Sequence, residues 1–273
     1  MFGCLTVQRR PGLSGAERAA LRLRPAKGLR LGGGLYRTSL FRWAEVTLPE
    51  EWRPALAERR VLAALEALRA EGVCRTAAPP EWRGAVLRAG LLPLEENSAL
   101  EACAAQAVDE GCRALGLPPE EAGLAVCGRG ISGPVQDQVL ALGRRMRTVR
   151  VWGGENRELR ARLWRDCGIV DRGPMPQGTP VIALLLREGT PPPETALVID
   201  LSENGAETLP QEAWRPDLLP PPGALKLLPP GLTPRSFAAA LLDAGAIQAR
   251  EIRVSRLDIG KRAQYNKETG NNC

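Results

Sequence analysis

The sequence predicts a protein of the α/β class, with a mainly parallel sheet covered by helices. The chain has 273 residues, of which 44% are apolar and 25% charged, enough for one large core or two smaller ones. In its second half, short apolar segments alternate with segments of helix length, as in parallel sheets. Proline pairs and glycines separate these segments. We expect a smaller α/β or α+β subdomain over 1–118, a larger α/β domain over 119–258, and a polar tail over 259–273.

The first half begins with strand-like segments near 5–7 and 36–48. We expect Gly32-Gly33-Gly34, between them, to be a flexible turn. A helix over 49–70 follows, because apolar residues recur there at helical spacing and Gly72 is a suitable C-cap. The shorter elements expected after it are a strand at 73–74, a helix over 80–88, a strand at 91–92 and a helix over 97–115.

The second half is more regular. The expected strands are 124–127, 149–152, 181–186 and 196–201, with helices over 134–146 and 156–167. Strands separated by helices of this length predict a parallel sheet. After a proline-rich connector, Thr233 and Pro234 have the features of an N-cap and a first-turn proline. They predict a helix as far as Ala244, followed by a last strand over 251–257.

Several kinds of chemistry are excluded by composition. The chain contains no histidine, so it has no Ser-His-Asp or Cys-His catalytic group and no histidine-ligated metal. No carboxylate and thiolate cluster suitable for a metal is visible. No C-x-x-C pair occurs among the cysteines, which we interpret as reduced thiols of a cytoplasmic protein. They are Cys4, Cys74, Cys103, Cys112, Cys127, Cys167 and Cys273. No segment approaches the run of about 18 apolar residues that crosses a bilayer, so we expect no membrane partner.

The net charge of +6, with a pI near 9.2, favours nucleic acid as one alternative partner. Two observations oppose it. Arginines are interleaved with Glu and Asp along the chain, which is typical of solvated helix faces. Aromatic residues, which could stack on bases, make up only 4% of the chain. We therefore do not expect nucleic acid to be the partner, whereas a protein partner stays open.

A glycine pattern lies between an expected strand and an expected helix. Gly128, Gly130 and Gly133 have the G-x-G-x-x-G spacing, and Glu155 follows about 20 residues later. From Gly128 to Glu155 the segment resembles the Rossmann-type nucleotide-binding superfamily. The resemblance implies that the glycine amides face the pyrophosphate of NAD(P). It further implies that Glu155 contacts a ribose, or that Arg157 contacts a 2′-phosphate.

The phase of the following helix opposes a bound dinucleotide. A close-packing Gly133 would direct Asp137 and Leu140 towards the sheet. The apolar stripe, however, lies on nearly the opposite side and consists of Val135, Val139, Leu142 and Met146. Burial of these four side chains, at about 1.5–3 kcal/mol each, should decide the orientation. We therefore expect a Rossmann-like fold with no cofactor and a non-catalytic binding or scaffold function. The alternative is an NAD(P)-binding oxidoreductase.

An oxidoreductase would also need an acid or base near its substrate. The candidates are Asp171 and Asp200, each after an apolar segment, and Lys226 in a proline-rich connector. Asp200 is the best placed, because ligands of parallel sheets bind at the carboxyl ends of the strands. A simpler interpretation is that Asp200 forms a turn with Ser202. The sequence therefore assigns no catalytic residue.

Overall fold

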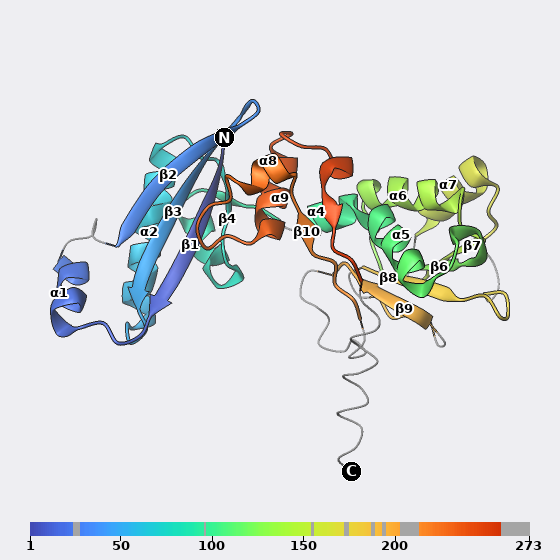
Figure 1. Ribbon diagram of the computed structural model, residues 1–273, viewed down its shortest axis with the longest axis horizontal. Helices are drawn as coiled ribbons and strands as arrows, with labels where there is room; N and C mark the ends of the chain where they lie inside the picture. The colour runs from blue at the N-terminus through green and yellow to red at the C-terminus, as the bar shows by residue number, and fades with distance from the viewer. Residues whose placement is uncertain are drawn as a thin grey trace, which may run out of the picture. The chain divides into compact units, whose positions relative to one another are not determined.

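The computed structural model describes residues 1–23, 28–95, 97–153, 156–171, 175–186, 189–192, 195–202 and 213–257. The chain forms two compact units (Figure 1). The first unit is Met1–Ala99 with Leu219–Arg253, and the second is Leu100–Leu218 with Val254–Cys273. These units differ from the expected halves because the chain returns to the first unit after Leu218. The expected polar tail lies outside the described residues.

The first unit contains a five-stranded sheet in the order β2-β3-β1-β4-β5. Neighbouring strands are parallel except for the antiparallel pair of β2 and β3. The strands are β1 (Phe2–Arg10), β2 (Leu29–Tyr36), β3 (Ser39–Pro49), β4 (Arg75–Ala77) and β5 (Leu92–Pro93). A helix that the sequence pattern does not predict, α1 (Gly15–Leu23), follows β1. The four parallel strands therefore have the order β3-β1-β4-β5, in which the first strand in the chain is second in the sheet.

Helices cover both faces of this sheet. On one face, α2 (Pro54–Ala70), the turn η1 (Pro80–Trp82) and α3 (Arg83–Arg88) bury a core with Leu5, Ala44 and Val46. On the other face, Phe237 of α9 (Pro234–Asp243) meets the rings of Phe2 and Phe41, with centroids 6.5 and 5.4 Å away. The expected N-cap of α9 is confirmed, because Thr233 Oγ1 accepts a hydrogen bond from the Ser236 amide at 3.1 Å. A short helix, α8 (Pro222–Leu225), precedes α9.

The prediction of a flexible turn at Gly32-Gly33-Gly34 is wrong, because these residues form the middle of β2. A Cβ at Gly32 would lie 2.4 Å from the Trp43 ring, and a Cβ at Gly34 would lie 2.6 Å from the Phe41 ring. The paired residues of β3 therefore lay their rings across a strand that has no side chains there. Close packing on the neighbouring strand explains these glycines better than backbone freedom does.

The second unit contains a four-stranded sheet in the order β7-β6-β8-β9, with all strands parallel. The strands are β6 (Gly123–Cys127), β7 (Thr148–Trp152), β8 (Val181–Leu185) and β9 (Thr195–Asp200). The parallel sheet predicted between 124 and 201 is confirmed. Trp214 adds a parallel bridge beside Ile199 of β9. As among the four parallel strands of the first unit, the first strand in the chain is second in the order.

The helices of the second unit are gathered on one face of its sheet (Figure 1). They are α5 (Ala104–Leu115), α6 (Gly133–Gly143) and α7 (Arg157–Cys167). The helix expected over 97–115 is two helices, because α4 (Asn97–Ala102) ends before Cys103, the N-cap of α5. Met175 and Ala213, in irregular segments, pack on the opposite face. The remaining elements are η2 (Pro119–Glu121), η3 (Ala249–Glu251) and a separate two-stranded sheet of β10 (Leu218–Leu219) and β11 (Arg253–Val254).

The predicted orientation of α6 is confirmed. Val135, Val139 and Leu142 are fully buried, and Met146, just beyond the helix, is buried as well. Asp137 is exposed. The apolar stripe, and not the glycine spacing, therefore sets the rotation of α6 on the sheet. None of the helices in the described part of the chain is long and apolar enough to span a membrane.

We expect Gly34→Ala to destabilise the first unit by about 1–3 kcal/mol, because the new methyl group would overlap the buried Phe41 ring. Gly84→Ala is the control. Gly84 lies in α3, and a Cβ there would have the Arg88 guanidinium, at 3.6 Å, as its nearest neighbour. At this position alanine should stabilise by up to ~1 kcal/mol. Chemical denaturation measures both, and equal effects of the two changes would contradict the packing explanation.

Candidate functional site

The glycine turn follows β6 at the carboxyl edge of the second sheet and leads into α6. Gly128 has φ 151° and Gly130 has φ 59°, values that side chains disfavour. A Cβ at Gly130 would meet no atom within 4 Å. The first two glycines of the pattern are therefore required by the backbone conformation of the turn, with or without a ligand.

Gly133 does not have the packing role that the dinucleotide pattern gives to its third glycine. A Cβ on Gly133 would meet nothing within 4 Å, so no strand or helix approaches it closely. Close approach occurs elsewhere. A Cβ at Gly143, where α6 ends, would lie 3.1 Å from Ile169, and one at Gly111 of α5 would lie 2.7 Å from Leu197.

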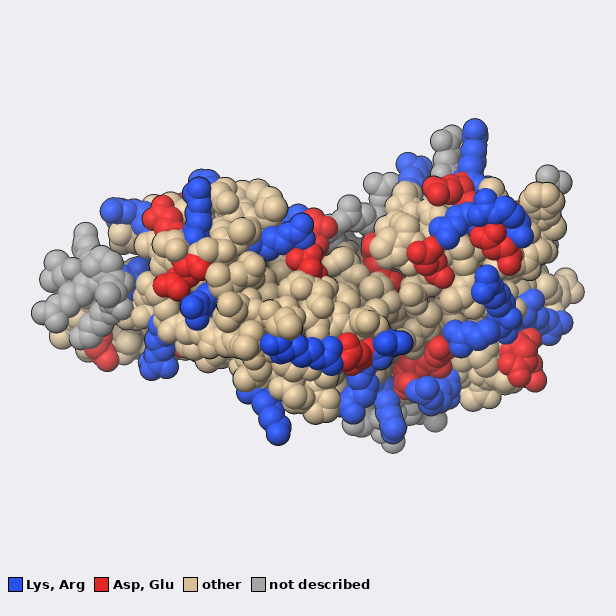
Figure 2. All heavy atoms as spheres, turned by 90° about the horizontal axis from the view of Figure 1, so that it is seen from above, with Lys and Arg blue, Asp and Glu red and all other residues tan. Residues whose placement is uncertain are grey.

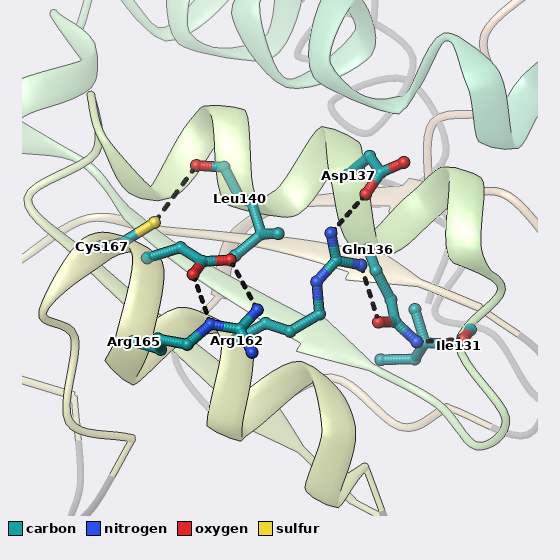
Figure 3. A network of polar contacts seen from close by, with 8 residues as sticks. Ile131, Gln136, Asp137, Leu140, Arg162, Arg165 and Cys167 are labelled. Carbon is teal, nitrogen blue, oxygen red and sulfur yellow. Dashed lines mark hydrogen bonds and ion pairs between the residues drawn. The ribbon is translucent and has the colours of Figure 1, made fainter.

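A polar network holds α6 to α7 (Figure 3). The amide of buried Gln136 donates to the Ile131 carbonyl at 3.0 Å, and its oxygen accepts from Arg162 at 3.2 Å. Arg162 also pairs with Asp137 at 2.6 Å. The dinucleotide pattern would direct Asp137 to the sheet. Here Asp137 instead pairs with the Arg162 guanidinium on the outer side of the helix. The same network fixes the Ile131 carbonyl within the glycine turn.

A carboxylate lies at the N-terminus of α6. Ser132 is the N-cap residue, yet its side chain caps no helix amide. Its hydroxyl instead donates to Glu101 Oε2 at 2.7 Å. Glu101 is in α4, so a distant segment of the same unit supplies an anion where the helix dipole favours negative charge. Glu101 could not be identified from the sequence, because no local pattern links it to Ser132.

The loop after β7 is tied to the glycine turn by Asn156. Its buried side-chain amide donates to the carbonyls of Gly128 at 2.9 Å and Gly153 at 3.1 Å. Arg157, the residue proposed to contact a 2′-phosphate, is exposed at the start of α7. Glu155, the proposed ribose ligand, lies outside the described residues. The structure thus brings Gly128 and Asn156 together.

Leu186 and Gly189, which follow β8, contact the end of β6. The Leu186 amide donates to the Cys127 carbonyl at 2.8 Å. A Cβ at Gly189 would lie only 2.3 Å from the Cys127 oxygen, so the backbone of Gly189 is in contact with the end of β6. In open parallel sheets, ligands bind at the carboxyl edge where the strand order reverses. In this sheet that position lies between β6 and β8. Here the protein's own chain lies beside it.

The turn has a counterpart in the first unit. Gly12-Leu13-Ser14-Gly15 follows β1 as Gly130-Ile131-Ser132-Gly133 follows β6. Gly12 also has a positive φ, 70°, and no atom would meet a Cβ on Gly12 or Gly15 within 4 Å. Ser14 also pairs with a glutamate, since it exchanges hydrogen bonds with Glu17 in a capping box. In both units the tetrapeptide makes a left-handed turn and a serine–glutamate pair.

The two aspartates among the acid and base candidates have separate partners. Asp200 Oδ1 accepts from the amide and hydroxyl of Ser202 at 2.8 and 2.6 Å, which is the turn anticipated from the sequence. Asp171 accepts from the Val151 amide at 3.0 Å and pairs with Arg160 at 2.8 Å, along the outer edge of β7. Lys226 is exposed in the first unit, beside α8. Both carboxylates thus have structural partners.

The buried thiols are held in their neutral form. Burial raises the pKa of Cys103 and Cys127 to about 12, and it also raises the pKa of Cys4. A thiol is nucleophilic only as the thiolate, so these side chains behave as small apolar groups. Among the described residues, no cluster of three or more carboxylate or thiol side chains could hold a metal ion.

Comparison with models of protein families and with curated proteins finds no match for this chain.

We expect Gly130→Ala to destabilise the protein by about 1–2 kcal/mol, because alanine resists a φ of 59°. Gly133→Ala is the matched change at the same turn. It should be neutral within about 0.5 kcal/mol, or stabilising, since its Cβ meets nothing and alanine favours the helix. Urea denaturation distinguishes the two. A loss above ~2 kcal/mol for Gly133→Ala would mean that Gly133 packs closely after all.

The free energy of unfolding should vary little between pH 6 and 8, since no histidine titrates there. Above pH 9.0, the ordinary pKa of a thiol, the Cys127 thiol of the unfolded chain loses its proton. In the folded chain the same thiol is buried and stays protonated to about pH 12. Stability is therefore lost as the pH rises through this window. Cys127→Ala should make the fall shallower by up to about 1.4 kcal/mol per pH unit.

Cys74→Ala, at an exposed position, is the control for that experiment and should keep the wild-type slope. Chemical denaturation under reducing conditions, repeated across this pH range, measures the free energy of unfolding of wild type and of both variants. Identical slopes for wild type and Cys127→Ala would show that this thiol is not protected in the folded chain.

Proposed function

We propose that this chain is a non-catalytic binding or scaffold protein whose second unit is Rossmann-like but takes no dinucleotide. The observation that carries the proposal is the carboxylate of Glu101, 2.7 Å from the hydroxyl of Ser132 at the N-terminus of α6. In a dinucleotide-binding unit that helix end faces the pyrophosphate. Here the protein supplies its own anion.

Electrostatics supports this interpretation. Two like charges 4 Å apart repel each other by about 4 kcal/mol at an effective dielectric constant of ~20. A pyrophosphate at the amides of α6 would meet the charge of Glu101 in addition to losing its hydration. The backbone of Gly189 against the end of β6 narrows the same region. A dinucleotide would therefore need both groups to move.

The fold assignment is supported by the strand order β7-β6-β8-β9 and by the glycine turn after β6. In the flavodoxin-like order, 2-1-3-4-5, the first strand also lies between the second and the third. An enzyme would need an acid or base, for which Asp171 and Asp200 are the candidates. Asp171 is instead paired with Arg160, and Asp200 is hydrogen-bonded to Ser202, so a purely structural role fits both side chains. We infer a cytoplasmic protein that acts by binding another protein, consistent with its buried, protonated thiols.

Titration calorimetry tests the proposal. Wild-type protein should show no saturable heat with millimolar NAD or NADP. The competing hypothesis, an NAD(P)-linked oxidoreductase, expects binding that disappears in a folded Gly130→Ala variant, because a side chain at Gly130 would block the phosphates. That result would defeat the proposal.

Glu101→Gln is the variant that isolates the role of the carboxylate. Glutamine keeps an acceptor for the Ser132 hydroxyl but removes the charge. Inorganic pyrophosphate should therefore bind the variant more tightly than it binds wild type. Equal pyrophosphate affinity for both proteins, with both folded, would remove Glu101 from the explanation.

A further inference from the structure

Strand β2 leaves one edge of the first sheet open. Among the described residues it pairs only with β3, so the backbone groups along its outer edge have no strand partner. Soluble proteins usually protect such an edge with lysine, proline, a bulge or a very short strand. β2 is eight residues long, contains neither lysine nor proline, and carries Arg30 as its only charge. The edge is therefore suited to accept another strand.

Exposed leucines lie beside this edge. Leu31, Leu35 and Leu40 are 49%, 57% and 50% exposed. Leu35 and Leu40 are paired across the β-hairpin, and Leu31 is paired with Ala44. All three lie on the face that α2 covers further in, where Ala44 is completely buried. The apolar face of the sheet thus continues to the open edge without cover.

The sequence of β2 is nearly the same in both directions. Around Gly33, the flanking pairs are Gly32 with Gly34 and Leu31 with Leu35. Two copies of β2 in antiparallel register about Gly33 would pair Leu31 with the partner's Leu35, and Leu35 with the partner's Leu31. A shift by one residue would instead place leucine opposite glycine and lose both contacts. The strand is therefore complementary to itself, as a two-fold interface requires.

The charges fit the same register. Arg30 lies opposite the partner's Tyr36, whose phenol oxygen can accept a hydrogen bond from a guanidinium. The two copies of Arg30 lie at opposite ends of the ladder, about 20 Å apart at ~3.4 Å per residue. This separation exceeds the Debye length of about 8 Å at physiological salt. Each Arg30 also keeps its own Glu45 at 3.7 Å. Within β2 no like charges oppose each other, and Arg37, which lies over the Tyr36 ring, is paired with Glu251 of its own chain.

We propose that β2 is a dimerisation strand, which pairs with β2 of a second copy of this chain around Gly33 and joins the two first-unit sheets into one. This interface is independent of the function proposed for the second unit. The partner at the open edge is β2 of the second copy, which carries the same leucines and glycines.

Sedimentation velocity of the full chain over a range of concentrations tests the surface. Wild type should shift from monomer to dimer as concentration rises. Leu31→Lys with Leu35→Lys should weaken association at least about tenfold, equivalent to about 1.4 kcal/mol. Leu92→Lys is the matched control, since Leu92 is 55% exposed on β5, at the other edge of the sheet, and this variant should dimerise as wild type does. Circular dichroism confirms that each variant is folded.

Cross-linking tests the register. Leu31→Cys and Leu35→Cys chains should form an intermolecular disulfide when mixed, because residues 31 and 35 of different copies would be opposite each other, within the reach of a disulfide. Either variant alone should cross-link no more than wild type, whose native thiols are the background. A wild type that stays monomeric, a lysine variant that dimerises as wild type does, or equal cross-linking in the mixed and single variants would each overturn the proposal.

Discussion

The arrangement of the second unit depends on how α6 lies on its sheet. Val135, Val139 and Leu142 are completely buried, and each contributes about 1.5–3 kcal/mol through burial. No hydrogen bond at the glycine turn is comparable to this sum. Once the stripe faces the sheet, Asp137 must face outwards, where it binds Arg162, and Gly133 must leave the packed side. The dinucleotide spacing is then present in sequence without its packing consequence.

Several described groups at the carboxyl edge have partners within the protein. Asn156 binds the carbonyls of Gly128 and Gly153, Glu101 binds Ser132, and Gly189 lies against Cys127. The first unit has an equivalent turn after β1, in which Ser14 and Glu17 bond to each other. A Gly-aliphatic-Ser-Gly segment therefore makes a stable strand-to-helix turn in this chain when paired with a glutamate. A ligand is not needed to explain its residues.

Much of the second unit could be predicted from sequence. Its short apolar strands and amphipathic helices have strong periodicity, so the parallel sheet and the buried stripe of α6 follow from local pattern. The first unit was harder, because β2 has glycines where a strand normally has side chains. Only the rings of Trp43 and Phe41, eleven and seven residues further along the chain from Gly32 and Gly34, explain them. α1 was missed because it is short and mostly exposed.

The candidate site was predicted only in part, for a similar reason. The left-handed glycines follow from spacing, whereas Glu101 and Gly189 approach the turn from distant segments. The repeat of Gly12-Leu13-Ser14-Gly15 at Gly130-Ile131-Ser132-Gly133 was visible in the sequence and would have indicated a structural turn. Charged side chains of both signs are mixed on the face that Figure 2 shows, as the interleaved sequence pattern predicts.

The most direct measurement follows the backbone amides of the turn by NMR. In a ¹H–¹⁵N spectrum of the labelled protein, the resonances of Gly130, Ser132 and Gly133 report any anion at the N-terminus of α6. With Glu101 in place, we expect these resonances to stay unchanged when millimolar NAD or NADP is added. A saturable shift that is largest at these three amides would show that a dinucleotide binds there despite Glu101. That result would contradict the claim that the protein supplies its own anion at this end of α6.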